Sequence, residues 1–173
     1  MRARLNGTFR VFSDDGHDIT PVGMKERGLI ALLLASPGQR RTRIWLQSLL
    51  WSDRAPHQAS GSLRQALSNV RKALGPHSDR VCADQTTLWF QPEVTLDERA
   101  AGEFLGDLDI RDPEFSDWLR DRRAEHEQRA TAYQPAAPTH AGMPLADTLA
   151  RPLVELRWTD MGVAPRSRFL THA

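Results

Sequence analysis

Residues 56–75 place on one side of a predicted helix a set of polar side chains suited to binding a polyanion. At about 100° per residue, an apolar arc is formed by Leu63, Leu67, Val70 and Leu74, flanked by Ala59, Ala66 and Ala73. The opposite face consists of Gly61, Arg64, Gln65, Ser68, Asn69, Arg71 and Lys72. Amides and guanidinium groups pair with base edges, and lysine and serine bind phosphate. Alternatively, the stretch is a solvated surface helix that happens to contain no acidic residue, although such helices usually mix both charge signs.

The distribution of charge along the chain supports a basic binding surface. The 173 residues carry a net charge of only +1, but residues 1–75 carry +7, residues 76–132 carry −7 and residues 133–173 carry +1. A basic half joined to an acidic half suggests that the first half meets a polyanion and the second does not. The hydrophobic share of 40% and the charged share of 26% are those of a globular protein with a substantial core.

Other classes of protein find little support in the sequence. No apolar run reaches the roughly 18 residues of a membrane helix, and the N-terminus lacks the apolar segment of a secretory signal. Cys82 is the single cysteine, so no internal disulfide forms, and we expect a cytoplasmic protein with a buried, unreactive thiol in a strand. The six histidines are scattered, and neither a GxGxxG motif nor a P-loop occurs. We therefore expect no enzyme, no metal site and no cofactor.

The elements before residue 56 are predicted from turn residues and apolar periodicity. Residues 2–20 contain short apolar runs broken by Asn6-Gly7 and by a turn at residues 14–16, which predicts a small antiparallel sheet. Residues 24–36 predict a mostly buried helix that ends at Pro37-Gly38. Residues 39–43 form a basic connector in this prediction. Thr42 then caps a second helix over residues 43–51, whose apolar positions, expected to pack on the first helix, are Ile44, Trp45, Leu46, Leu49 and Leu50.

The elements after residue 75 follow from similar signals. Residues 80–90 divide into two strands around Asp84-Gln85-Thr86, and residues 94–97 are either a strand or irregular. Asp112 as N-cap and Pro113 as first residue predict a helix to residue 132 that docks by its first half; its apolar stripe is Phe115, Trp118 and Leu119. From residue 133 onward a Pro/Ala-rich linker and a poorly ordered tail are expected.

A resemblance to a known family joins these observations. Residues 24–90 look like a winged-helix DNA-binding domain of the OmpR type and, more closely, like that of SARP-like bacterial transcriptional activators. The matching segments are residues 36–43, residues 49–54, residues 59–75 and the wing-like residues 83–90. Residues 103–123 are similar to the acidic start of the helical activator region, called BTAD, that follows this domain in the family.

The resemblance implies an α+β fold. Its winged helix-turn-helix would have an N-terminal antiparallel sheet and a C-terminal β-hairpin wing, followed by a helical appendage. The expected parts are a DNA-binding domain at 1–97, an acidic helical segment at 98–132 and the tail at 133–173. The implied function is a sequence-specific, cytoplasmic bacterial transcription regulator with helix 56–75 in the major groove of double-stranded DNA. The alternatives are a winged-helix module that binds protein, and a truncated, inactive regulator fragment.

The resemblance also implies roles for individual residues. By position in the family pattern, Gln65 and Asn69 point most directly at base edges. The residues that flank them and contact bases or backbone are Arg64, Ser68, Arg71 and Lys72. The residues expected at phosphate before the second helix are Arg40, Arg41 and Arg43. Thr86 and Thr87 would touch the minor groove or backbone from the wing tip. Trp45, Trp51 and Trp89 are expected in the core instead of stacking on bases.

The sequence leaves open which partners the chain binds and whether it is a whole regulator. The acidic helix 114–132 could bind RNA polymerase or another activator subunit, or could simply pack on its own domain as a solvated helix; a dimer on DNA is a further possibility. Family members usually continue into a helical-repeat region, whereas this chain leaves the pattern near Tyr133. We therefore expect either a truncated or frame-disrupted gene or a dedicated short regulator. No receiver domain is expected, and so no control by aspartyl phosphorylation within the chain.

Overall fold

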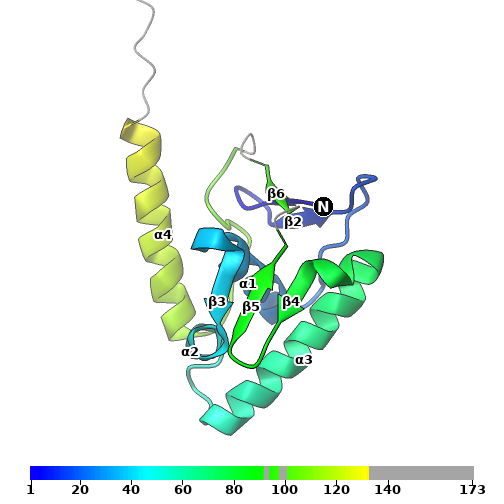
Figure 1. Ribbon diagram of the computed structural model, residues 1–173. Helices are drawn as coiled ribbons and strands as arrows, with labels where there is room; N and C mark the ends of the chain where they lie inside the picture. The colour runs from blue at the N-terminus through cyan, green and yellow to red at the C-terminus, as the bar shows by residue number, and fades with distance from the viewer. Residues whose placement is uncertain (92–93, 98–100, 133–173) are drawn as a thin grey trace, which may run out of the picture. The chain divides into compact units, whose positions relative to one another are not determined.

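The computed structural model describes residues 1–91, 94–97 and 101–132, which form an α+β protein (Figure 1). Within them, the helices are α1 (Met24–Leu34), α2 (Arg43–Leu50), α3 (Pro56–Leu74) and α4 (Pro113–Ala132). The strands are β1 (Arg2–Arg4), β2 (Arg10–Phe12), β3 (Arg40–Thr42), β4 (Val81–Ala83), β5 (Thr87–Phe90) and β6 (Thr95–Leu96). Two short 3₁₀ helices, Pro37–Gln39 and Gly75–Arg80, precede β3 and β4. None of the helices in these ranges has both the length and the apolar character needed to span a bilayer.

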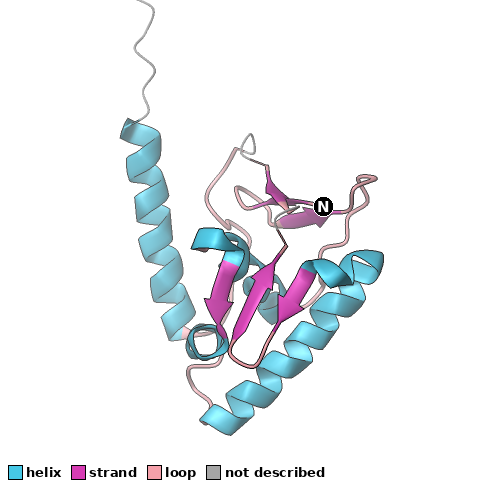
Figure 2. Ribbon diagram, viewed as in Figure 1, coloured by secondary structure: helices cyan, strands magenta, loops and turns pink. Residues whose placement is uncertain are grey.

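The N-terminal sheet has the strand order β2-β1-β6. Figure 2 shows the strands of this sheet and of the second sheet in magenta. The predicted antiparallel pair is confirmed, with Ala3 opposite Val11, and both side chains are fully buried. Gly7, with φ +70°, provides the turn between the two strands. The third strand, β6, pairs parallel with β1 and resolves the open prediction for residues 94–97 in favour of a strand.

The second sheet has the order β3-β5-β4 and contains the predicted hairpin. The prediction of a simple connector at residues 39–43 was wrong, because Arg40–Thr42 pairs antiparallel with β5. The free edge of a two-stranded hairpin carries unpaired backbone groups, and β3 satisfies those of β5. The polar sequence of β3 gives no strand signal, so the pairing depends on tertiary structure.

The helical core confirms the apolar stripe of α3 and corrects that of α2. All four residues of the predicted arc in α3 are buried, as are Ala59 and Ala66, while Ala73 is half-buried. They pack against α1, in which the run from Leu29 to Leu34 is buried. On α2, Ile44 is 79% exposed and does not pack on α1 as predicted. Thr42 does cap α2, because its hydroxyl accepts a hydrogen bond from the Trp45 amide at 3.3 Å.

The first three helices end one or two residues before the predicted positions, whereas α4 ends at residue 132 as predicted. Helix α1 stops at residue 34, α2 at residue 50 and α3 at residue 74. Gly75 follows α3 with φ +54°, a conformation that glycine adopts without strain and that ends the helix.

Residues 101–132 belong to the same compact unit, Met1–Pro135, as the two sheets and the first three helices. Phe104 is buried, and the predicted stripe of α4 packs beside it. Docking extends further along α4 than predicted, since the His126 ring stacks on Phe104 with centroids 4.3 Å apart. The predicted tail, residues 133–173, lies outside the described residues.

The start of α4 is fixed by Asp112 in a way that differs from an ordinary N-cap. Its carboxylate, which is buried, accepts hydrogen bonds from Ser52 N at 3.0 Å and Ser52 Oγ at 2.8 Å. Lys25 Nζ lies 3.7 Å away. Asp112 thus holds the beginning of α4 against the turn between α2 and α3, and the helix begins at Pro113 as predicted.

Candidate functional site

The polar face of α3 divides into three strips relative to the buried stripe. Gln65, Ser68 and Lys72 are exposed and lie roughly opposite the stripe on a helical wheel. Arg64 and Arg71 lie on the side toward the start of α2 and the 3₁₀ helix Gly75–Arg80, because Arg43 and Ser78 line one groove with them. Asn69 lies on the opposite side, toward α1, and is half-buried. The predicted helix face is therefore present: Arg64 and Arg71 lie on one side, Asn69 lies on the other, and Gln65 and Lys72 lie between them.

A shallow groove runs along the side of α3 that carries Arg64 and Arg71. It is lined by Arg43, Arg64, Leu67, Ser68, Arg71, Lys72 and Ser78. Four of these seven side chains are cationic, and none of the seven is a carboxylate. The groove joins α3 with the start of α2 and with the 3₁₀ helix that follows α3. It brings together five of the residues predicted from the sequence to bind DNA.

Backbone contacts to the hairpin fix two of the groove cations. Arg43 donates from its backbone N to Thr86 O at 2.7 Å and from its side-chain Nε to Asp84 O at 2.8 Å. Arg71 Nη2 donates to Val81 O at 3.1 Å. Both guanidinium groups keep further donors, since each carries five N–H groups. The hairpin backbone therefore holds Arg43 of α2 and Arg71 of α3, two of the cations that line the groove.

Arg40 and Arg41 lie on β3 and do not line this groove. The Arg40 guanidinium carbon is 4.7 Å from the ring centroid of Trp89. That of Arg41 is 4.4 Å from the ring of Trp45, and Arg41 Nε donates to Ser36 Oγ at 2.6 Å. Arg40 Nη2 also lies 3.9 Å from the Asp84 carboxylate, so Arg40 and Arg43 both contact Asp84 at the hairpin tip.

The tip of the hairpin is a hydrogen-bonded turn built around Asp84. Its carboxylate accepts from the Thr86 amide at 2.8 Å and from the Thr87 amide at 2.6 Å, and these two bonds hold the pKa of Asp84 below its usual range. Thr86 is exposed, while Thr87 is half-buried and pairs with Thr42. Of the two predicted tip residues, Thr86 is the one open to a ligand.

The two amides predicted to read bases are linked to each other and to a carboxylate. Gln65 Nε2 donates to Asn69 Oδ1 at 3.0 Å, and Asn69 Nδ2 donates to Glu26 Oε1 on α1 at 2.7 Å. Sequence analysis did not identify Glu26, because a contact across 43 residues leaves no trace in local periodicity. Glu26 thus joins the candidate site through Asn69.

The tryptophans and the cysteine fit structural roles to different degrees. Trp51 is buried and Trp45 packs against the core, as expected. Trp89 is half-buried beneath Arg40, so it is only partly a core residue. Cys82 is half-buried, less than predicted, with Sγ 3.5 Å from Asp79 O.

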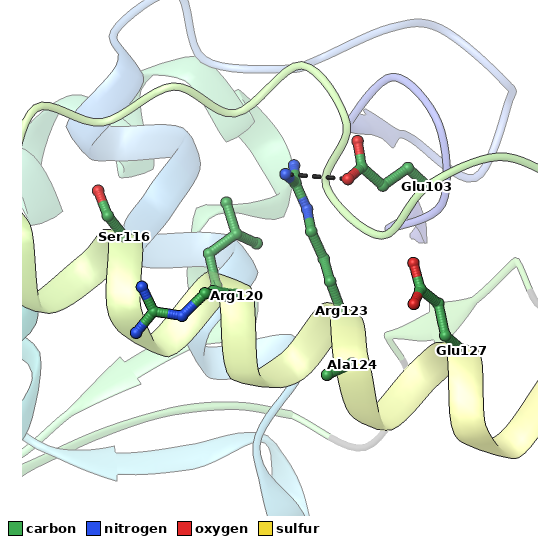
Figure 3. A pocket seen from close by; sticks show the side chains of 7 residues that line it. Glu103, Ser116, Arg120, Arg123, Ala124 and Glu127 are labelled. Atoms are coloured by element: carbon green, nitrogen blue, oxygen red, sulfur yellow. Dashed lines mark ion pairs between the residues drawn. The ribbon is translucent and has the colours of Figure 1, made fainter.

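A second hollow lies between α4 and the loop before it, and Figure 3 shows its lining. Arg123 reaches across from α4, with an ion pair to Glu103 at 3.0 Å and hydrogen bonds to Phe104 O at 3.0 Å and Leu105 O at 2.9 Å. Arg120 points elsewhere and pairs with Asp117 at 2.9 Å. The arginine that dominates this hollow therefore holds the loop in place, a structural role.

Comparison of the chain with protein-family models, with curated proteins and with solved structures found no match. The function is therefore inferred from the geometry and chemistry of the residues described above.

Proposed function

We propose that the chain is a sequence-specific regulator of transcription that binds double-stranded DNA through a winged helix-turn-helix of the SARP-like type. In this proposal α2 and α3 form the helix-turn-helix, α3 enters the major groove, and the β4–β5 hairpin is the wing. The observation that carries the proposal is the groove that joins α3 to the start of α2 and to the 3₁₀ helix Gly75–Arg80, with four cations and no carboxylate in its lining.

The dimensions of α3 suit this role. Its 19 residues span about 28 Å at 1.5 Å per residue. A helix of this kind fits a major groove about 12 Å wide. Gln65 and Ser68 on the outward line would face base edges, while Arg64 and Arg71 would lie toward one phosphate backbone. Thr86 at the hairpin tip would lie toward the same backbone.

Four phosphate contacts imply a strong dependence on salt. With a slope of about −0.9 per neutralised phosphate, four contacts predict that affinity falls roughly 150-fold between 50 and 200 mM salt. The test is binding of the purified full chain to labelled genomic fragments at both concentrations. Enrichment of particular fragments together with this loss would support the proposal. Absent binding, or binding that salt does not weaken, would refute it.

We propose further that the acidic segment contacts another protein, such as RNA polymerase. The exposed carboxylates of α4 that support this are Glu114, Asp117, Asp121, Glu125 and Glu127. Capture of RNA polymerase from nuclease-treated extract, and loss of that capture when Asp121 and Glu125 are replaced by alanine, would support the contact. The rival interpretation, a protein-binding module without specific DNA binding, predicts capture of a partner together with no fragment enrichment.

A further inference from the structure

We propose that Gln65 is the base-reading amide of α3, and that Asn69 and Glu26 are positioning residues that orient it. This inference rests on the proposed function, because it assigns roles within the DNA-binding face. It concerns a chain of three side chains, called here the amide relay: Glu26 on α1, Asn69 and Gln65 on α3.

The relay is continuous and crosses from one helix to another. Asn69 Nδ2 lies 2.7 Å from Glu26 Oε1, and Gln65 Nε2 lies 3.0 Å from Asn69 Oδ1. Gln65 and Asn69 are four residues apart and therefore neighbours on one helix face. Glu26 lies in the first turn of α1, which packs against α3. The relay thus anchors a flexible exposed side chain to a packed helix pair.

The chemistry of the three groups fixes the direction of the hydrogen bonds. A carboxylate only accepts hydrogen bonds, so Asn69 must turn its NH₂ group toward Glu26. The Asn69 oxygen then faces Gln65, which must donate from its own NH₂ group. The orientation of both amides follows from the charge on Glu26, and neither amide is free to flip without losing a bond.

The residues around Glu26 leave room for its carboxylate at the position where it contacts Asn69. Gly23 caps α1, and a Cβ built there would lie only 2.0 Å from Glu26 Oε2. The absence of a side chain at residue 23 therefore leaves the space that the carboxylate occupies. Glu26 is half-buried, which limits competition by water for its contact with Asn69.

The relay leaves one amide able to read DNA. Asn69 is half-buried on the α1 side, with its oxygen and one N–H engaged. Gln65 is exposed and retains its oxygen and its second N–H. This acceptor and donor together are the pair that glutamine uses for bidentate binding of adenine in the major groove. We therefore assign an adenine contact to Gln65 and a positioning role to Asn69.

The test compares base preferences of variants selected on randomised double-stranded DNA. Gln65→Ala should lower the preference at one base pair by about 5- to 150-fold, the usual range for a bidentate contact. Asn69→Ala and Glu26→Ala should each lower the preference at the same base pair by about two- to tenfold, because the Gln65 side chain must then be ordered on binding. The double variant Gln65→Ala/Asn69→Ala should resemble Gln65→Ala at that position.

Control variants distinguish a loss of Gln65 orientation from a change in net charge and from a loss of stability. Glu26→Ala also removes a negative charge, which raises affinity for all DNA, so the readout is base preference instead of affinity. Glu26→Gln keeps an acceptor for Asn69 but can also donate, so it should relax the base preference less than Glu26→Ala does. Each variant is compared with wild type by thermal unfolding, and Glu114→Ala, which removes an exposed carboxylate of α4, is the matched charge control.

The outcomes distinguish this inference from the proposed function. The relay is refuted if Asn69→Ala lowers the preference at a different base pair from Gln65→Ala. It is also refuted if Glu26→Ala leaves the preference unchanged. Neither result would contradict DNA binding itself. If the wild-type chain selects no sequence at all, the proposed function itself fails.

Discussion

Replacing Asp112 with alanine should destabilise the compact unit and release the start of α4 from the α2–α3 turn. The Asp112 side chain is only 1% exposed. It accepts hydrogen bonds at 3.0 and 2.8 Å from Ser52 N and Oγ and lies 3.7 Å from Lys25 Nζ. The substitution removes all three contacts at once.

The expected loss follows from these contacts. A hydrogen bond to a charged group contributes about 1.5–3 kcal/mol. Ser52 is exposed and Lys25 is partly exposed, so both regain water when the carboxylate is lost. We therefore expect a total of about 2–3 kcal/mol, which corresponds to a decrease in Tm of about 6–12 °C for a unit of this size.

Urea and thermal unfolding, followed by tryptophan fluorescence, measure this loss. Asp117→Ala is the matched control, because Asp117 lies on the same helix with an exposed side chain and should change stability by less than about 0.5 kcal/mol. Asp112→Asn should cost less than Asp112→Ala, since an amide can accept from Ser52 N and donate to Ser52 Oγ. If Asp112→Ala and Asp117→Ala were equally stable, the role given to Asp112 would be wrong.

Three further predictions concern the groove, a helix cap and acid stability. Lys72→Ala should reduce the slope of log affinity against log salt by about 0.9; an unchanged slope would place Lys72 away from phosphate. Thr42→Ala should cost about 1 kcal/mol in urea unfolding, because α2 loses its N-cap bond; a loss below about 0.3 kcal/mol would mean that the cap contributes nothing. Burial, aided by Arg129 and Arg122, lowers the pKa of His126 below 6.5, so the unfolded chain takes up the proton first as pH falls. The free energy of unfolding should therefore decrease below about pH 6.5, and less so in His126→Gln; the same decrease in that variant would contradict the assignment.

Elements with strong local signals could be predicted from the sequence. The stripe of α3 was predictable because its buried residues recur at helical spacing and because Gly75 ends the helix at a positive φ. The hairpin was predictable because Asp84 supplies a turn between two apolar runs. Asp112-Pro113 correctly marked the start of α4.

Features that depend on distant contacts could not be predicted in the same way. β3 and β6, of three and two residues, exist because other strands offer them backbone partners. The exposure of Ile44 depends on how α2 is rotated against α1, which apolar periodicity alone does not define. The bond from Asn69 to Glu26 and that from Asp112 to Ser52 connect residues far apart in the chain. Contacts between residues this far apart, among them the Asn69–Glu26 bond of the candidate site, are what only the structure reveals.

Charge reversal in the groove tests most directly whether this surface binds DNA. Arg64→Glu places a carboxylate in the groove, whereas Arg120→Glu makes the same change at an exposed site on α4. The measurement is the affinity of both variants and of wild type for one enriched genomic fragment at 100 mM salt. We predict at least a roughly tenfold loss for Arg64→Glu, since one phosphate contact becomes repulsive, and wild-type affinity for Arg120→Glu. Equal affinities of the two variants would contradict the assignment of the groove as the DNA-binding surface.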